Sequence, residues 1–138
     1  EYGFEIVHMP TKHQTNIDIM KFERHYITQR YLETIEDKTS IVLVTDTLDV
    51  VFQSNPFDWY RKNKNNKLLL GSEGVTINHE FWNYGIINRQ FTQYISDVAQ
   101  NDVLCAGVIM GEIETVKELM FYIFNFFYSI FNIGNTFA

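Results

Sequence analysis

The sequence predicts an α/β domain in which helices flank a mostly parallel β-sheet. Strand-like and helix-like segments alternate along the chain, which is typical of such layered folds. The run Ile41–Val44 (IVLV) is apolar and β-branched, as in a strand that is buried on both faces of a parallel sheet. The 138 residues suit one domain, and no repeat or linker divides them. We therefore expect one continuous unit.

The composition narrows the classes of protein to which the chain can belong. A content of 46% hydrophobic and 16% aromatic residues argues against intrinsic disorder. The net charge of −6 and the lack of a Lys/Arg cluster argue against nucleic acid as a partner. The single cysteine, Cys105, cannot close an intrachain disulfide. A lone cysteine fits both the cytoplasm and the lumen of the secretory pathway, so the compartment stays open.

The first part of the chain predicts a short strand and a long helix. Phe4–His8 (FEIVH) is strand-like, and Thr15 and Asp18 form a capping pair at the start of a helix. This helix is expected to run from about Asn16 to about Asp37. Its apolar stripe is predicted to pack on the sheet, with Glu23 and Arg24 off the stripe. The stripe consists of Met20, Ile27, Tyr31 and Ile35.

The second part predicts two more strands. Pro56 is expected to open a short helix, because proline suits the first helical turn. The run Lys67–Leu70 (KLLL) predicts a strand that ends at Gly71–Gly74, and a helix is expected over about Ile86 to Ala99. Val103–Met110 (VLCAGVIM) predicts a strand whose glycine marks a bend or a close approach to a ligand.

The last strongly apolar segment is Leu119–Phe131 (LMFYIFNFFYSIF). It is shorter than the roughly 18 residues that a membrane span needs, and Asn125 and Ser129 interrupt it. No transmembrane segment is therefore expected. A buried helix is the favoured interpretation, and a helix lying on a membrane surface is the alternative.

Two carboxylates follow the strand that is predicted with most support. Asp46 and Asp49 stand at its carboxyl end, where open α/β sheets bind ligands. A turn through Thr47 and Leu48 would bring both side chains to one point and make a site for a hard divalent cation. Alternatively, Asp46 closes a turn and Asp49 is solvated. A phosphatase-type aspartate pair is excluded, because position 48 is Leu.

The segment Thr45–Phe57 (TDTLDVVFQSNPF) resembles the Asp-x-x-Asp motif of nucleotide-sugar glycosyltransferases of the GT-A type. It is similar to Thr-Asp-x-x-Asp-Val in procollagen-type glycosyltransferase domains and to a less characterised group with the extension Phe-Gln-x-x-Pro-Phe. LLLGSEG (Leu68–Gly74), Trp82-Asn83 and VLCAGVIMG (Val103–Gly111) follow in the order that this group shows. The resemblance covers about residues 17–124.

The resemblance implies a GT-A fold, which is Rossmann-like, and transfer of a sugar from a nucleotide-diphosphate-sugar donor to an acceptor. It also implies that Asp46 and Asp49 bind Mn²⁺ or Mg²⁺ on the donor diphosphate. Their carboxylates should then lie close together and face the Gly107 segment. Gly107 and Gly111 would allow close approach beside the sugar, although a glycine in a strand also fits a simple bulge. The acceptor, whether glycan, protein or small molecule, stays open.

Further donor contacts are implied less specifically. Glu73 matches an acidic position that contacts the sugar or caps a helix. Arg24, Arg30 and Lys21 are possible partners of the phosphates, and a salt bridge between helices explains Arg30 equally well.

The chain departs from the family pattern in two respects. Leu48 stands where close relatives often have Arg, and the chain stops before the segment that carries an Asp-Gln element. Residues 1–138 are therefore expected to be the central part of one GT-A domain. On their own they are expected to bind the donor weakly or not at all and to be inactive. The alternative is a truncated or degenerate domain that interacts with a partner without catalysis.

Overall fold

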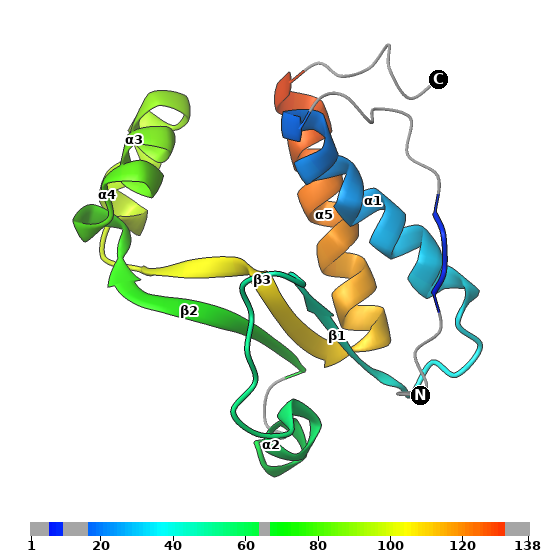
Figure 1. Cartoon of the computed structure of the whole chain (residues 1–138). Helices are drawn as coiled ribbons and strands as arrows, with labels where there is room; N and C mark the ends of the chain where they lie inside the picture. The colour runs from blue at the N-terminus through cyan, green and yellow to red at the C-terminus, as the bar shows by residue number, and fades with distance from the viewer. Residues whose placement is uncertain (1–5, 10–16, 64–66, 132–138) are drawn as a thin grey trace. The chain divides into compact units, whose positions relative to one another are not determined.

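The computed structural model of the chain describes residues 6–9, 17–63 and 67–131 (Figure 1). Contacts divide the chain into two compact units. A sheet unit comprises Ile41–Gly111, and a helical unit comprises Glu1–Ser40 and Glu112–Ala138. The predicted strand Phe4–His8 lies partly outside the described residues, and its described part, residues 6–8, has no regular secondary structure.

The regular elements follow the expected alternation of helix and strand. In chain order they are α1 (Ile17–Thr34), β1 (Ile41–Thr45), α2 (Pro56–Lys62), β2 (Leu68–Thr76), the 3₁₀ turn η1 (Ile77–His79), α3 (Phe81–Gln90), the 3₁₀ turn η2 (Thr92–Tyr94), α4 (Ile95–Val98), β3 (Asp102–Glu112) and α5 (Ile113–Phe131).

The sheet has the strand order β1-β3-β2 and is antiparallel, so the prediction of a mostly parallel sheet is wrong. Figure 1 shows β3 running between its two neighbours in the opposite direction. The helix α2 does connect two strands, β1 and β2, that point the same way, as a strand-helix-strand alternation predicts. The later strand β3 separates them, and alternation along the chain cannot reveal which strand lies in the middle.

Two irregularities shape the pairing of β2 with β3. Leu70 pairs with Ile109 while Gly71 pairs with Cys105, so β3 accommodates residues 106–108 as an insertion. Ser72 pairs with Leu104 and Thr76 with Asp102, so β2 has a compensating bulge at residues 73–75. The strand β2 therefore continues to Thr76, whereas the sequence predicted that it ends at Gly71–Gly74. Within that bulge Gly74 has a φ of 68°, a conformation that favours glycine.

Capping residues define the helices of the sheet unit. The Asn55 side chain accepts a hydrogen bond from the Phe57 N–H at 2.9 Å, and Pro56 occupies the first turn of α2 as expected. Glu80 caps α3 by accepting hydrogen bonds from the N–H groups of Trp82 and Asn83. These bonds lower the pKa of the Glu80 carboxyl. The helix predicted over about Ile86 to Ala99 is present in separate pieces: α3 begins earlier, at Phe81, and ends at Gln90, and η2 and α4 follow.

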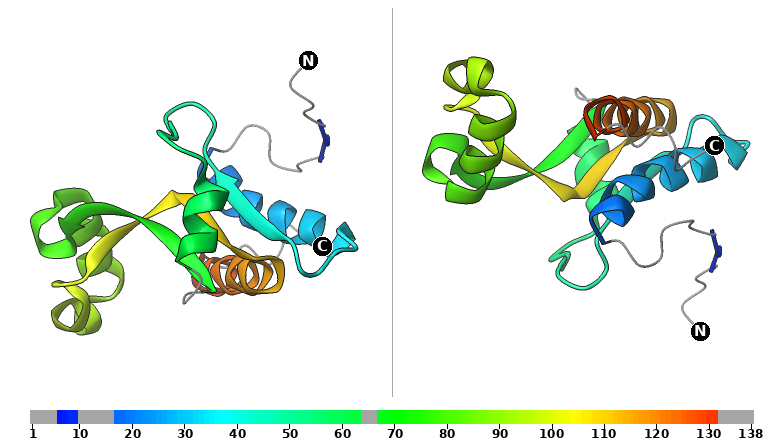
Figure 2. Two further views of the ribbon diagram at one scale, coloured as in Figure 1. Left: turned by 90° about the horizontal axis from the view of Figure 1, so that it is seen from below. Right: turned by 90° about the horizontal axis from the view of Figure 1, so that it is seen from above.

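In the helical unit α1 and α5 lie side by side (Figure 2). The rings of Phe22 and Phe127 have centroids 4.0 Å apart, and those of Tyr26 and Phe124 are 5.0 Å apart. Ile113, Val116 and Met120 of α5 are fully buried. The Ser40 carbonyl accepts a hydrogen bond from the Ile113 N–H at 3.1 Å. Aromatic contacts between the two helices and buried aliphatic side chains of α5 are therefore the main packing features of this unit.

The predicted apolar stripe of α1 is wrong. Met20 and Tyr31, two of its members, are exposed, whereas Glu23 and His25 are buried. The predicted burial of the aromatic helix holds for one face of α5. On its other side Phe121, Tyr122 and Phe126 are 47%, 61% and 51% exposed. Among the described residues no helix combines the length and the apolar character that crossing a bilayer requires.

The burial of His25 makes the stability of the helical unit depend on pH. Desolvation lowers the pKa of the imidazole below its ordinary value of 6.5, and the positive charge of Arg24 lowers it further. The backbone carbonyls of Lys21 and Phe22 act in the opposite direction and do not reverse the shift. The folded chain therefore holds His25 neutral at a pH at which the unfolded chain protonates it.

We expect the free energy of unfolding to decrease as the pH falls below about 6.5. Because the pKa of His25 is lower in the folded chain, its contribution to stability is fully present above the pKa of the unfolded chain. This contribution is lost as the pH falls toward the pKa of the folded chain. Urea unfolding at about pH 8 and about pH 5 measures the difference. It should shrink in His25→Leu and persist in His79→Leu, because His79 is exposed. The lowered pKa values of Asp37, Glu80 and Glu114 act below this range, since their ordinary values are 3.8 to 4.5. An equal pH dependence in wild type and His25→Leu would contradict the assignment.

Candidate functional site

Asp46 stands at the carboxyl end of β1, and its backbone extends the pairing with β3. The Asp46 N–H donates a hydrogen bond to the Gly107 carbonyl at 3.0 Å. Asp46 is half-buried, and its side chain lies against the Gly107 backbone. The strand end therefore fixes the position from which this carboxylate projects.

The insertion in β3 brings Gly107 to this position. Gly107 is the middle residue of the inserted segment 106–108. A Cβ at Gly107 would lie 2.7 Å from Asp46 Oδ2, which is closer than side chains approach one another. The absence of a side chain at Gly107 is thus what allows the Asp46 carboxylate to occupy its place. Asp46, which was predicted to bind the metal, and Gly107, which was predicted to lie beside the sugar, therefore meet here.

Asp49 follows in a bend formed by residues 47–49 and is exposed. Leu48, between the two carboxylates, is 99% exposed. Thus Asp46 is held at the sheet edge while Asp49 projects from the loop. No group of three or more His, Cys, Asp or Glu side chains in the described ranges is arranged to hold a metal ion. In those ranges the protein would supply at most these two carboxylates to a cation at this loop.

Gly111 has a packing role that the resemblance does not imply. It pairs with Leu68, and a Cβ at this position would collide with the carbonyl oxygen of Lys67. The Leu68 Cα and Cδ1 atoms would each lie 3.3 Å from that Cβ. Gly111 is buried, and the close approach that it permits is to the protein's own strand β2.

Glu73 lies in the bulge of β2 and is exposed. Its predicted alternative role as a helix cap is wrong, because the cap of the following α-helix is Glu80. Beside it, the Ser72 hydroxyl donates to Asp102 Oδ2 at 3.1 Å and accepts from the Gly74 N–H at 3.0 Å. Glu73 therefore projects from a bulge that its neighbours hold in shape.

Arg24 and Arg30 belong to α1 in the helical unit, whereas Asp46 belongs to the sheet unit. Both arginines are exposed. Arg30 pairs with Glu33 Oε2 at 2.5 Å, one helical turn away on the same helix. The salt bridge anticipated for Arg30 thus exists, but within α1 and not between helices. Exposed pairs of this kind contribute about 0.3–0.5 kcal/mol.

The hydrogen bonds around η1 were not predicted from the sequence. The Thr76 hydroxyl lies 2.6 Å from Asn78 Oδ1 and 2.9 Å from His79 Nδ1. With the Glu80 cap, these contacts order the connection from β2 to α3. Glu80 was not detectable as a cap, because the residues that usually cap the N-terminus of a helix are Ser, Thr, Asp and Asn.

Comparison of the chain with protein-family models finds no match, and neither curated proteins nor solved structures match it significantly. The resemblance to GT-A glycosyltransferases therefore rests on the residues of this chain alone.

The packing of Gly111 predicts a large difference between two glycine substitutions. Gly111→Ala should lower the free energy of unfolding by about 1–3 kcal/mol, because the backbone of Lys67 and Leu68 must move. Gly85→Ala should raise it by about 0.5–1 kcal/mol, because Gly85 lies within α3 and a Cβ there meets no atom within 4 Å. Urea denaturation measures both. Equal stability of the two variants would contradict the packing described for Gly111.

Proposed function

We propose that this chain belongs to a glycosyltransferase that moves a sugar from a nucleotide-diphosphate-sugar donor to an acceptor. Asp46 and Asp49 would hold Mn²⁺ or Mg²⁺ on the donor diphosphate. The observation that supports this proposal best is the contact between the Asp46 carboxylate and the Gly107 backbone at the end of β1. It unites two segments, Thr45–Phe57 and Val103–Gly111, that each resemble the same family.

The donor atoms suit a cation of this kind. Mg²⁺ and Mn²⁺ prefer oxygen ligands, and Mg²⁺ is commonly held by one or two carboxylates together with phosphate and water. When bound, the cation would stabilise the negative charge that develops on the departing nucleoside diphosphate. The chain positions Asp46 by the hydrogen bond from its own N–H to the Gly107 carbonyl. Asp49 lies on an exposed loop, where it can meet a ligand that arrives from solvent.

The remaining donor contacts are part of the same proposal. Glu73 is exposed and is free of a capping role at α3, which suits a contact with the sugar. Gly107 would keep the space beside Asp46 open.

A non-catalytic interaction module is the second candidate. Large aromatic side chains are exposed on two helices, and this observation favours it. On α3, Phe81 and Trp82 are 93% and 65% exposed. On α5, Phe121, Tyr122 and Phe126 are exposed on the side away from the buried residues. Cation and donor binding separate the two candidates, because only the enzyme requires them.

Substitution of either carboxylate tests the cation site. We expect Asp46→Asn and Asp49→Asn each to weaken Mn²⁺ binding by at least about tenfold, because the charge of the ligands sets the affinity. Titration with Mn²⁺, followed by the electron paramagnetic resonance signal of the free ion, measures this without an activity assay. Asp58→Asn is the matched control, because Asp58 is exposed and pairs with Arg61 on α2.

In a longer protein that contains this chain, transfer from a panel of UDP- and GDP-sugars in the presence of Mn²⁺ should fall in the same two carboxylate variants. If the wild-type chain binds no Mn²⁺ and a longer protein that contains it transfers no sugar, the interaction module becomes the better explanation. If both variants bind Mn²⁺ as tightly as wild type, the assignment of the two carboxylates is wrong.

Gly107→Ala separates the position of the Asp46 carboxylate from its chemistry. The new Cβ would meet the end of a side chain, which can rotate away, so unfolding stability should change by less than about 1 kcal/mol. The displaced carboxylate should nevertheless weaken Mn²⁺ binding about three- to tenfold. The same titration and urea unfolding measure the two effects. Unchanged Mn²⁺ affinity in Gly107→Ala would show that the Asp46–Gly107 contact does not position the ligand.

A further inference from the structure

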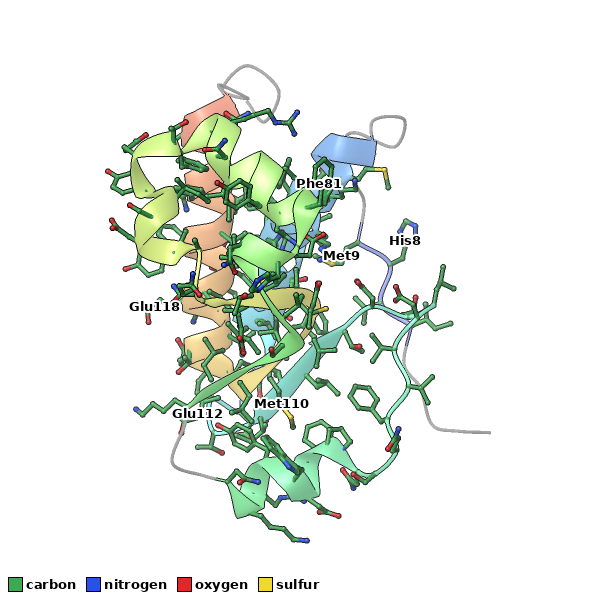
Figure 3. All side chains as sticks on the ribbon, turned by 90° about the vertical axis from the view of Figure 1, so that its left-hand side faces the viewer. His8, Met9, Phe81, Met110, Glu112 and Glu118 are labelled. Carbon is green, nitrogen blue, oxygen red and sulfur yellow. The ribbon has the colours of Figure 1, made fainter. Side chains whose placement is uncertain are left out.

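The sheet unit contains an apolar cavity of about 350 Å³ beside the loop that carries Asp46 and Asp49. All residues that line it belong to this unit. One wall is the sheet, which contributes Leu43, Leu69 and Met110 from its three strands. Figure 3 shows Met110 on β3 near the helix α2. The cavity is thus built on the same strands that position Asp46.

The opposite wall comes from the chain that directly follows Asp49. This segment contributes Val51 and Phe52, and α2 contributes Trp59. Phe52 and Trp59 are 42% and 53% exposed, so the aromatic wall is accessible from solvent. Gln53 and Ser54 are the polar side chains of the lining. Two aromatic faces and few polar groups are suited to a compact apolar ring and not to a ligand rich in hydroxyl groups.

We propose that this cavity binds an apolar ring, aromatic or alicyclic, of the acceptor molecule. The volume lies within the range of small-molecule sites and accommodates one or two rings. Gln53 and Ser54 are available for one or two hydrogen bonds that orient the ligand. The assignment of the ring to the acceptor rests on the proposed glycosyl transfer. It follows from the continuity of the chain, since the wall begins two residues after Asp49.

The two tryptophans of the chain provide a direct test. Trp59 lines the cavity, whereas Trp82 lies on α3 and is not part of the lining. Incorporation of 5-fluorotryptophan gives each a separate ¹⁹F resonance. Titration of the full chain with p-cresol should shift the Trp59 resonance saturably, with a Kd in the high-micromolar to low-millimolar range. The Trp82 resonance should stay in place, and glucose should shift neither.

A matched pair of variants tests the aromatic wall. Phe52→Ala should weaken p-cresol binding about five- to tenfold, because it removes one aromatic face. Phe81→Ala should leave it unchanged, because Phe81 is 93% exposed and does not line the cavity. The inference is overturned if p-cresol shifts neither resonance, if it shifts both alike, if glucose binds at Trp59 more tightly, or if Phe52→Ala binds as wild type does.

The p-cresol titration uses neither metal nor nucleotide. A negative result therefore overturns the cavity proposal without bearing on the cation site. If p-cresol binds but Asp46→Asn changes neither Mn²⁺ binding nor sugar transfer, the assignment of the ring to the acceptor is overturned. Inhibition of sugar transfer by p-cresol, lost in Phe52→Ala, would support it.

Discussion

The pairing of β3 with strands on both of its sides is the constraint on which the candidate site depends. Between Cys105 and Ile109, β3 contains residues that have no partner on β2. The local ladder is interrupted there, and the carbonyl of Gly107 accepts the N–H of Asp46 on the other side. A backbone hydrogen bond and the lack of a Cβ therefore define where the first carboxylate lies. The position of the Asp46 backbone is therefore a property of the sheet.

Features that depend on neighbouring residues were predictable from the sequence. The strand β1 follows from a β-branched run, and the start of α2 follows from Asn55 and Pro56. The sheet direction was not predictable in the same way, because it depends on a strand that enters last and lies in the middle. The apolar stripe of α1 failed for a related reason. The partner of that helix is α5, whose aromatic rings meet Phe22 and Tyr26.

The candidate site was predictable only in part. The proximity of the segments around Asp46 and Gly107 was expected from the resemblance, and the contact between them is present. The role of Gly111 was not predictable, because it depends on the register that places Leu68 opposite it. Glycines four positions apart in one strand thus serve different purposes. Gly107 makes room for a carboxylate, and Gly111 makes room for a backbone.

The segment from Asp46 to Trp59 links the two proposed binding functions physically. It begins at a carboxylate fixed on the sheet edge and ends in a short helix that is capped by Asn55. Between these anchors Leu48 and Val51 are 99% and 87% exposed, although exposure of large apolar side chains is unfavourable. A ligand that contacts the carboxylates and the cavity together would cover part of this apolar surface. Donor and acceptor would then be bound by one continuous loop, and each would favour the loop conformation that the other requires.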